Sequence, residues 1–154
     1  MFIAIQEADF CQAELYQQLR QSGRDAGAIV TFTGLVRDHN PEGKINGLSL
    51  EHYPGMTEKA LLSLVTGAIT QFELIDAAAV HRVGRLHNDE QIVWVGCAAL
   101  HRRAAFEGAM YIMDMLKQSV PLWKKEFVGE QGHWVAPKAS DDAAAMAWLS
   151  GKKE

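Results

Sequence analysis

The sequence IDAAAVHRVGRLHNDEQIVWVGCAA, from Ile75 to Ala99, decides the fold of this chain. It contains two apolar segments, 75–83 and 91–99, and the polar stretch Leu86–Glu90 lies between them. Segments rich in apolar and β-branched residues that flank a polar turn are typical of paired strands. The two segments are close enough in sequence to form an antiparallel hairpin, and we expect one here.

Further strands and helices are expected on both sides of this hairpin. Strands are predicted at Phe2–Gln6, Ala28–Val36, Leu48–His52 and Leu122–Phe127. Helices are predicted at Phe10–Arg20 after an Asp9 N-cap, from near Pro54 to Ile69, at His101–Lys117 before Pro121, and from a Ser140 N-cap to near Gly151. Because local hairpins are mixed with helices, the sequence predicts an α+β fold with a largely antiparallel sheet and flanking helices.

Length and composition fit a single domain over residues 1–154. The chain has 154 residues, of which 48% are hydrophobic and 22% charged, and this excludes collagen-like, disordered and disulfide-framework proteins. Within the domain, Asp38–Gly47 (DHNPEGKING) is rich in turn-forming residues and is expected to be a mobile loop. Residues 139–154 are expected to form a C-terminal helix and tail.

Charge and cysteine content restrict the functional classes. A net charge of −4 argues against extensive nucleic-acid binding. No apolar run reaches the roughly 20 residues of a membrane span and no secretory signal is visible, so we expect a cytoplasmic protein. Cys11 and Cys97 lie far apart, and the histidines lack HxH or HExxH spacing, so no disulfide and no metal site are expected. His81, in an apolar strand, is expected to be a core or interface residue.

The first candidate for chemistry is His101-Arg102-Arg103, at the start of the long helix. A helix N-terminus carries unpaired N–H groups and partial positive charge, so it favours anions. Three basic side chains oppose the helix dipole there, which indicates a phosphate or carboxylate site. The alternative is that these side chains point into solvent or pair with acidic neighbours such as Glu107.

The second candidate comprises Lys117, Lys124, Lys125 and Glu126, on either side of Pro121. Strand alternation places Lys124 and Glu126 on one face and Lys125 on the other, with Trp123 and Phe127. A lysine beside Met113 and Trp123 is expected to be partly desolvated. The alternative is an ordinary solvated run of charges.

Two further patterns concern arginines. Arg37 ends a predicted strand just before the glycine-containing loop, where functional residues often lie, although a lone arginine also fits an ordinary surface position. Cys97 and Arg103 have the spacing of the C-x5-R loop of cysteine phosphatases and rhodaneses. That loop usually needs glycine, whereas Ala98, Ala99 and Leu100 here prolong a strand, so Cys97 is expected to face the core.

Several long blocks, in order along nearly the whole chain, closely resemble the large, catalytic subunits of molybdopterin synthases. The blocks are VTFTGLVRDHN (Val30–Asn40), LEHYPGMTEKAL (Leu50–Leu61), HRVG (His81–Gly84), HRRAAFEGAMYIMDMLKQSVPLWKKE (His101–Glu126) and HWV (His133–Val135). The resemblance implies an α/β-hammerhead fold and a sulfurtransferase of molybdenum-cofactor synthesis that needs no cofactor of its own.

The resemblance also implies a substrate, a sulfur donor and an assembly. The family converts cyclic pyranopterin monophosphate into molybdopterin by adding two dithiolene sulfurs. The sulfur arrives as a thiocarboxylate on the C-terminal Gly-Gly of a small ubiquitin-like subunit. Two large subunits form a central homodimer, and one small subunit at each end completes a heterotetramer. The competing classes are a cysteine phosphatase or rhodanese using Cys97 and Arg103, and a non-catalytic anion-binding dimer.

Carried over by position, the resemblance assigns functional roles to two groups of residues. Substrate contacts fall on Leu35, Val36, Arg37, His101 and Arg102, and the two functional lysines are Lys117 and Lys124, with Lys125 and Glu126 beside them. Two positions depart from the family pattern: Leu35, where lysine is common, and Lys138, where another basic residue is common.

Helix geometry makes this assignment difficult within one chain. His101 and Lys117 are sixteen residues apart, so on one continuous helix their backbones are separated by roughly 24 Å. A small pterin does not span that distance. Either the helix breaks near Gly108, or His101 and Arg102 of one protomer face Lys117 and Lys124 of its twin across a two-fold axis. We favour the composite site.

Overall fold

The predicted hairpin lies at the centre of the larger of two sheets. Strand β6 (Asp76–Arg82) pairs antiparallel with β8 (Gln91–Ala99), in a register that runs from Asp76 opposite Ala98 to His81 opposite Val93. Strand β1 (Phe2–Gln6) adds in parallel to β6, and β2 (Ala28–Leu35) adds antiparallel to β8. The resulting order is β1-β6-β8-β2, with β2 at one edge.

The computed structural model describes residues 1–40, 43–136 and 139–151, so Lys138 and residues 152–154 of the expected tail lie outside it. The remaining strands are β3 (His39–Asn40), β4 (Gly43–Lys44), β5 (Leu48–His52), β7 (Gly84–Leu86), β9 (Leu122–Val128) and β10 (Gln131–Val135). The helices are α1 (Gln12–Ser22), α2 (Met56–Gln71), α3 (Arg102–Ser119) and α4 (Ala139–Leu149). No helix among the described residues is long and apolar enough to cross a membrane.

The α+β class with largely antiparallel pairing is confirmed, but the strands form two principal sheets. The second sheet has the order β10-β9-β5-β7 and is antiparallel throughout. Its two outer strands were not predicted, because β7 has only three residues and β10 (QGHWV) carries few apolar ones. Gly84 connects β6 of one sheet to β7 of the other. Its φ of +83° is a conformation that residues other than glycine rarely adopt.

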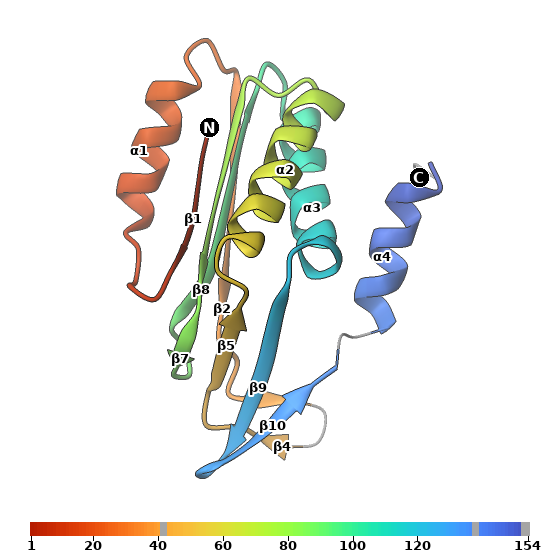
Figure 1. Ribbon diagram of the computed structural model, residues 1–154. Coiled ribbons are helices and arrows are strands. Elements are labelled where there is room, and N and C mark those ends of the chain that lie inside the picture. Colours follow the sequence, from red (N-terminus) through yellow and green to blue (C-terminus); the bar gives the residue numbers. More distant parts are fainter. Residues whose placement is uncertain (41–42, 137–138, 152–154) are drawn as a thin grey trace.

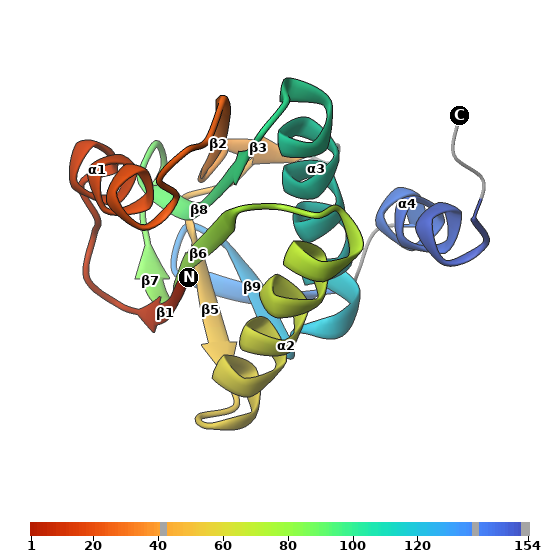
Figure 2. The same cartoon turned by 90° about the horizontal axis from the view of Figure 1, so that it is seen from above.

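Helices cover both faces of the larger sheet. α1 lies on one face, and α2 and α3 lie on the other, while α4 stands outside α3 (Figures 1 and 2). Alternate residues of β6 enter separate cores: Ala77 and Ala79 pack with the residues of α2 and α3, and Ala78 and Val80 pack with Leu19 of α1. Because both faces are covered, every residue of β6 is buried, which explains its continuous apolar sequence.

Three predicted features differ from the structure. α1 begins at Gln12, because the Asp9 carboxylate accepts hydrogen bonds from the Phe10 N–H (2.8 Å) and the Gln91 side chain (2.9 Å) instead of capping a helix. Ser140 lies inside α4, which begins at Ala139. The expected loop Asp38–Gly47 contains β3 and β4, which pair with each other, so part of it is a short hairpin.

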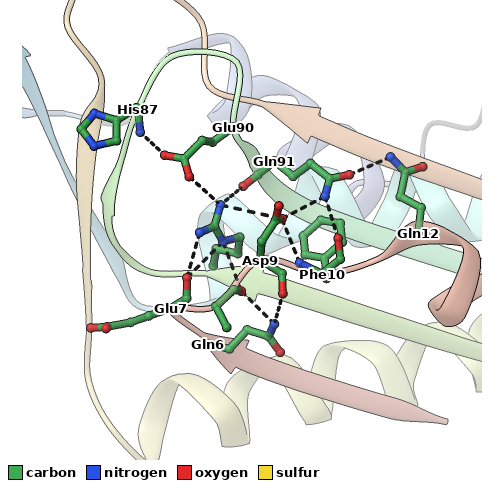
Figure 3. Close-up of polar contacts among 10 residues, drawn as sticks. Gln6, Glu7, Asp9, Phe10, Gln12, His87, Glu90 and Gln91 are labelled. Atoms are coloured by element: carbon green, nitrogen blue, oxygen red, sulfur yellow. Dashed lines mark hydrogen bonds and ion pairs between the residues drawn. The ribbon is translucent and has the colours of Figure 1, made fainter.

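A buried arginine, Arg82, joins the segment after β1 to the start of β8. The Arg82 guanidinium donates hydrogen bonds to the backbone oxygens of Glu7 (2.9 Å) and Gln91 (2.9 Å), and its Nη1 lies 3.5 Å from the Glu90 carboxylate. Figure 3 shows Glu7 from one segment converging with the adjacent residues Glu90 and Gln91 from another. The Glu90 carbonyl in turn accepts a hydrogen bond from the Val36 N–H (2.9 Å). Arg82 therefore supports the segment that leads to Arg37.

Replacing Arg82 with methionine should strongly destabilise the fold. The Arg82→Met variant fills similar space but leaves buried backbone oxygens without donors, so we expect the free energy of unfolding to fall by about 3 kcal/mol or more. Urea denaturation measures this change. The matched control is Arg103→Met. The Arg103 side chain is 88% exposed and, among the described residues, pairs only with Glu107, so this variant should leave the midpoint nearly unchanged. Equal midpoints for the two variants would contradict the role of Arg82.

Candidate active site

A cavity of about 820 Å³ lies where the two sheets meet the C-terminal end of α3. Its apolar lining comes from several elements and includes Leu48, Leu50, Ile92, Val93, Leu116, Val120 and Leu122. Its charged lining comprises Arg37, Lys117, Lys124, Glu126 and Asp141. A largely apolar cavity with a few converging charged groups is the usual form of a small-molecule site.

Lys117 lies in the last turn of α3, a position where a cation interacts favourably with the helix dipole. Its Nζ lies 3.3 Å from both carboxylate oxygens of Asp141, which belongs to the first turn of α4. The neighbouring pair Gln118 and Asp142 also joins the two helices. The Lys117 side chain is 49% exposed, so about half of it is withdrawn from solvent.

Lys124 and Glu126 project together from β9, as strand alternation predicted. The Lys124 Nζ lies 3.5 Å from the Glu126 carboxylate, and the Lys124 side chain is 32% exposed. Their partners across the strand pair are Leu50 and Leu48, which also line the cavity. Lys125 lies on the opposite face, where its Nζ is 5.2 Å from the centre of the Trp134 ring.

Leu35, Val36 and Arg37 reach the cavity at the end of β2. A register irregularity at Gly34 and Leu35 interrupts the pairing with β8. Val36 is buried, and its N–H and C=O bond to the turn at residues 89–90, so its position is fixed. Val36 is therefore held in place by its backbone hydrogen bonds. The next residue, Arg37, is exposed at the mouth of the cavity.

The basic residues at the start of α3 lie elsewhere. His101 is the N-cap and Arg102 the first helical residue, and neither lines the cavity. α3 runs without a break through Gly108, so the predicted alternative of a helix break is wrong. A Cβ at Gly108 would lie 2.9 Å from the Leu74 side chain, which shows that glycine serves close packing here. The two groups therefore stay roughly 24 Å apart within one chain.

The structure decides between the alternatives for Arg103 and for Cys97. Arg103 pairs with Glu107 at 3.7 Å, as the surface alternative predicted for that residue. Cys97 is fully buried in β8, and burial raises the pKa of its thiol to about 12. A protonated thiol facing the core and an exposed arginine do not form an oxyanion-binding loop, so the Cys97–Arg103 phosphatase alternative is wrong.

Several residues that line the cavity were not predicted as site residues, including the titratable residues His39, His81 and Asp141. Asp141 is one of two acidic residues in the first turn of a helix, and the helix dipole alone explains such a pattern. His81 is buried, as expected of a core residue, but its ring also lines the cavity. No cluster of three or more metal-ligating side chains occurs in residues 1–40, 43–136 and 139–151.

Comparisons with known proteins place this chain in a family. The model of the family "MoaE protein" matches residues 5–119. A molybdopterin synthase catalytic subunit from Pseudomonas aeruginosa is 44% identical over 148 residues, covering 96% of this chain and 99% of the relative. The protein of that name from Escherichia coli is also 44% identical, over 95% of this chain and 97% of its own length.

Comparison with solved structures indicates the same family. The structure of a molybdopterin biosynthesis MoaE protein from Burkholderia ambifaria superposes with a TM-score of 0.81 at 42% sequence identity, covering 96% of this chain and 98% of that one. The family model and these near full-length relatives agree, and the chain belongs to the MoaE family of molybdopterin synthase catalytic subunits.

Proposed function

We propose that this chain transfers sulfur to cyclic pyranopterin monophosphate, forming molybdopterin. The observation that carries this proposal is the convergence of Arg37, Lys117 and Lys124, from three separate segments, around one apolar cavity. The substrate has the matching composition, with a flat ring system and one anionic phosphate. Cations and an apolar lining together hold such a molecule, because charge-assisted hydrogen bonds bind the phosphate and the lining covers the rings.

The sulfur donor is a thiocarboxylated C-terminal Gly-Gly of a small ubiquitin-like subunit. Cys97 is buried in the core and Cys11 caps α1, and neither lines the cavity. Sulfur must therefore come from outside the described part of this chain. Exposed Leu35 and Trp123 stand at the rim and give a partner apolar surface to cover. Both cysteines are free thiols, which suits a cytoplasmic protein.

The two lysines act as electrostatic catalysts. Each is held by a carboxylate, Lys117 by Asp141 and Lys124 by Glu126. An incoming thiocarboxylate or phosphate competes with these carboxylates for the ammonium groups. Lys117 holds the anionic thiocarboxylate, and it stabilises the negative charge that passes to the substrate as the donor sulfur attacks, while Lys124 acts beside it. Glu126 positions Lys124 on the cavity face.

Alanine substitutions should rank the three lysines. We expect Lys117→Ala to lower single-turnover dithiolene formation by about 100-fold or more, and Lys124→Ala to have the second largest effect. Lys125→Ala is the matched control, because its side chain lies over Trp134 on the opposite face. The assay mixes each variant with substrate and thiocarboxylated partner, after circular dichroism and partner binding confirm the fold. A Lys125→Ala defect as severe as that of Lys124→Ala would contradict the assignment.

We further propose that the complete site is shared between two copies of this chain. His101 and Arg102 lack acidic partners among the described residues, yet no single chain brings them to the cavity. The edge strand β2 and the outer face of α3 carry exposed apolar side chains: Phe32, Phe106 and Met110. A two-fold dimer through this surface covers them and presents the start of one α3 to the cavity of the twin.

Mixing two inactive variants tests the shared site. A His101→Ala/Arg102→Ala protein and a Lys117→Ala protein are combined and allowed to exchange subunits. A heterodimer then holds one site with both wild-type halves, so a 1:1 mixture should regain about one quarter of wild-type activity. Native mass spectrometry confirms exchange. Complete exchange without any return of activity would rule out the shared site.

A non-thiol mechanism also predicts that Cys97 is dispensable. Cys97→Ala should retain turnover close to that of wild type, with only a loss of stability from the small space left in the core. The measurement is dithiolene formation at a temperature where the variant is folded. Loss of turnover by the folded variant would instead support a persulfide or phosphocysteine route through this thiol.

A further inference from the structure

His81 is the buried polar side chain of the cavity. His81 is only 6% exposed, and it is the most buried of the polar residues that line the cavity in the described part of the chain. It lies near the end of β6, opposite Val93 of β8 and Ile5 of β1. Since Val93 also lines the cavity, this end of the larger sheet forms its inner wall.

One hydrogen bond fixes the protonation state of this ring. The His81 Nδ1 lies 2.8 Å from the backbone oxygen of Arg82. A carbonyl oxygen only accepts, so Nδ1 carries the proton and Nε2 keeps a lone pair. Burial lowers the pKa of His81 to about 4, against a smaller opposing effect of that hydrogen bond. The ring is therefore neutral near pH 7, with Nε2 as an acceptor.

Nε2 is the polar atom that this ring can offer to the cavity, because Nδ1 is already bonded to the strand. No described residue donates a hydrogen bond to Nε2. The same cavity is lined by apolar residues that include Leu50, Leu122 and Val93, the cross-strand partner of His81. An acceptor in such a place needs a donor from a ligand or from water. A cyclic phosphate carries no proton near pH 7 and cannot supply one, whereas reduced pterin rings carry N–H and amino donors.

We propose that His81 binds the pterin end of the substrate, its Nε2 accepting a hydrogen bond from a ring N–H or amino group. The cations Arg37, Lys117 and Lys124 then hold the phosphate and the incoming thiocarboxylate nearer the mouth. His81 thereby fixes the orientation of the substrate, with the pterin directed inward and the phosphate outward. This inference rests on the proposed function and adds the residue that recognises the pterin.

Two substitutions of His81 test the roles of its two ring nitrogens separately. In His81→Asn the amide nitrogen replaces Nδ1 and keeps the bond to the Arg82 oxygen, but the acceptor at Nε2 is lost. In His81→Gln the amide oxygen reaches the Nε2 position, while the bond to Arg82 is weakened. We expect His81→Asn to weaken binding of cyclic pyranopterin monophosphate by about tenfold, and His81→Gln to keep most of the affinity. A purely structural histidine predicts the reverse order.

Isothermal titration of the full-length chain measures these affinities, and inorganic phosphate serves as a second probe. Phosphate binding should be the same in wild type and both His81 variants and weaker in Arg37→Ala. In wild type, the ¹⁵N resonance of His81 Nε2 should shift on addition of substrate, while that of Nδ1 should not. Unchanged substrate affinity in His81→Asn, or an Nε2 resonance that does not move, would overturn the inference.

The same experiments separate this inference from the proposed function. If wild type binds the substrate and forms the dithiolene with a thiocarboxylated partner, while His81→Asn behaves like wild type, only the role of His81 fails. If wild type does not bind the substrate or does not form product, the proposed function fails, and the inference fails with it.

Discussion

The close contact between α3 and the β6–β8 hairpin is the constraint on which the rest of the structure depends. Gly108 lies against Leu74 and the Cys97 sulfur, at distances that leave no room for a larger side chain. Alanines along β6 allow the same close approach over the rest of this face. Because α3 is one continuous helix from Arg102 to Ser119, its two ends are held far apart. The separation of the two basic clusters follows from this packing.

The same packing explains how a chain with a net charge of −4 presents a site for anions. Each lysine of the cavity is already paired, Lys117 with Asp141 and Lys124 with Glu126. These pairs are partly exposed, so they hold the side chains in place without strong stabilisation. In the mechanism that we propose, an anionic ligand replaces the carboxylate beside each lysine with another group of the same charge, so the lysines stay positioned before and after binding.

The inner end of the cavity is organised by backbone contacts rather than by charge. Arg82 joins the segment after β1 to the turn at residues 87–91. The backbone N–H and C=O of Val36 both form hydrogen bonds with that turn. The carbonyl of Arg82 also holds the His81 ring. Arg82 therefore supports the backbone that leads to Arg37. Its neighbour in β6, His81, holds the Nε2 atom that we propose as the acceptor.

The sequence by itself determined the hairpin of β6 and β8, the strands β1, β2, β5 and β9, and the long helix α3. Each of these has a strong local pattern of apolar residues that neighbouring elements do not overrule. Strand alternation also placed Lys124 and Glu126 on one face and Lys125 on the other. The resemblance to the family supplied the remaining candidate residues and the reaction.

Only the tertiary structure decided the features that arise between elements distant in sequence. The Asp141 contact with Lys117 needs α4 to dock on α3, and neither helix shows this in its own sequence. Asp9 looked like a helix cap until the fold brought Gln91 beside it. His81 looked like an ordinary core residue, because whether a buried ring faces a core or a cavity depends on what the second sheet leaves unfilled. The local sequence determines on which face of a strand or helix a side chain lies. Whether that face meets packed side chains or a cavity depends on other parts of the chain.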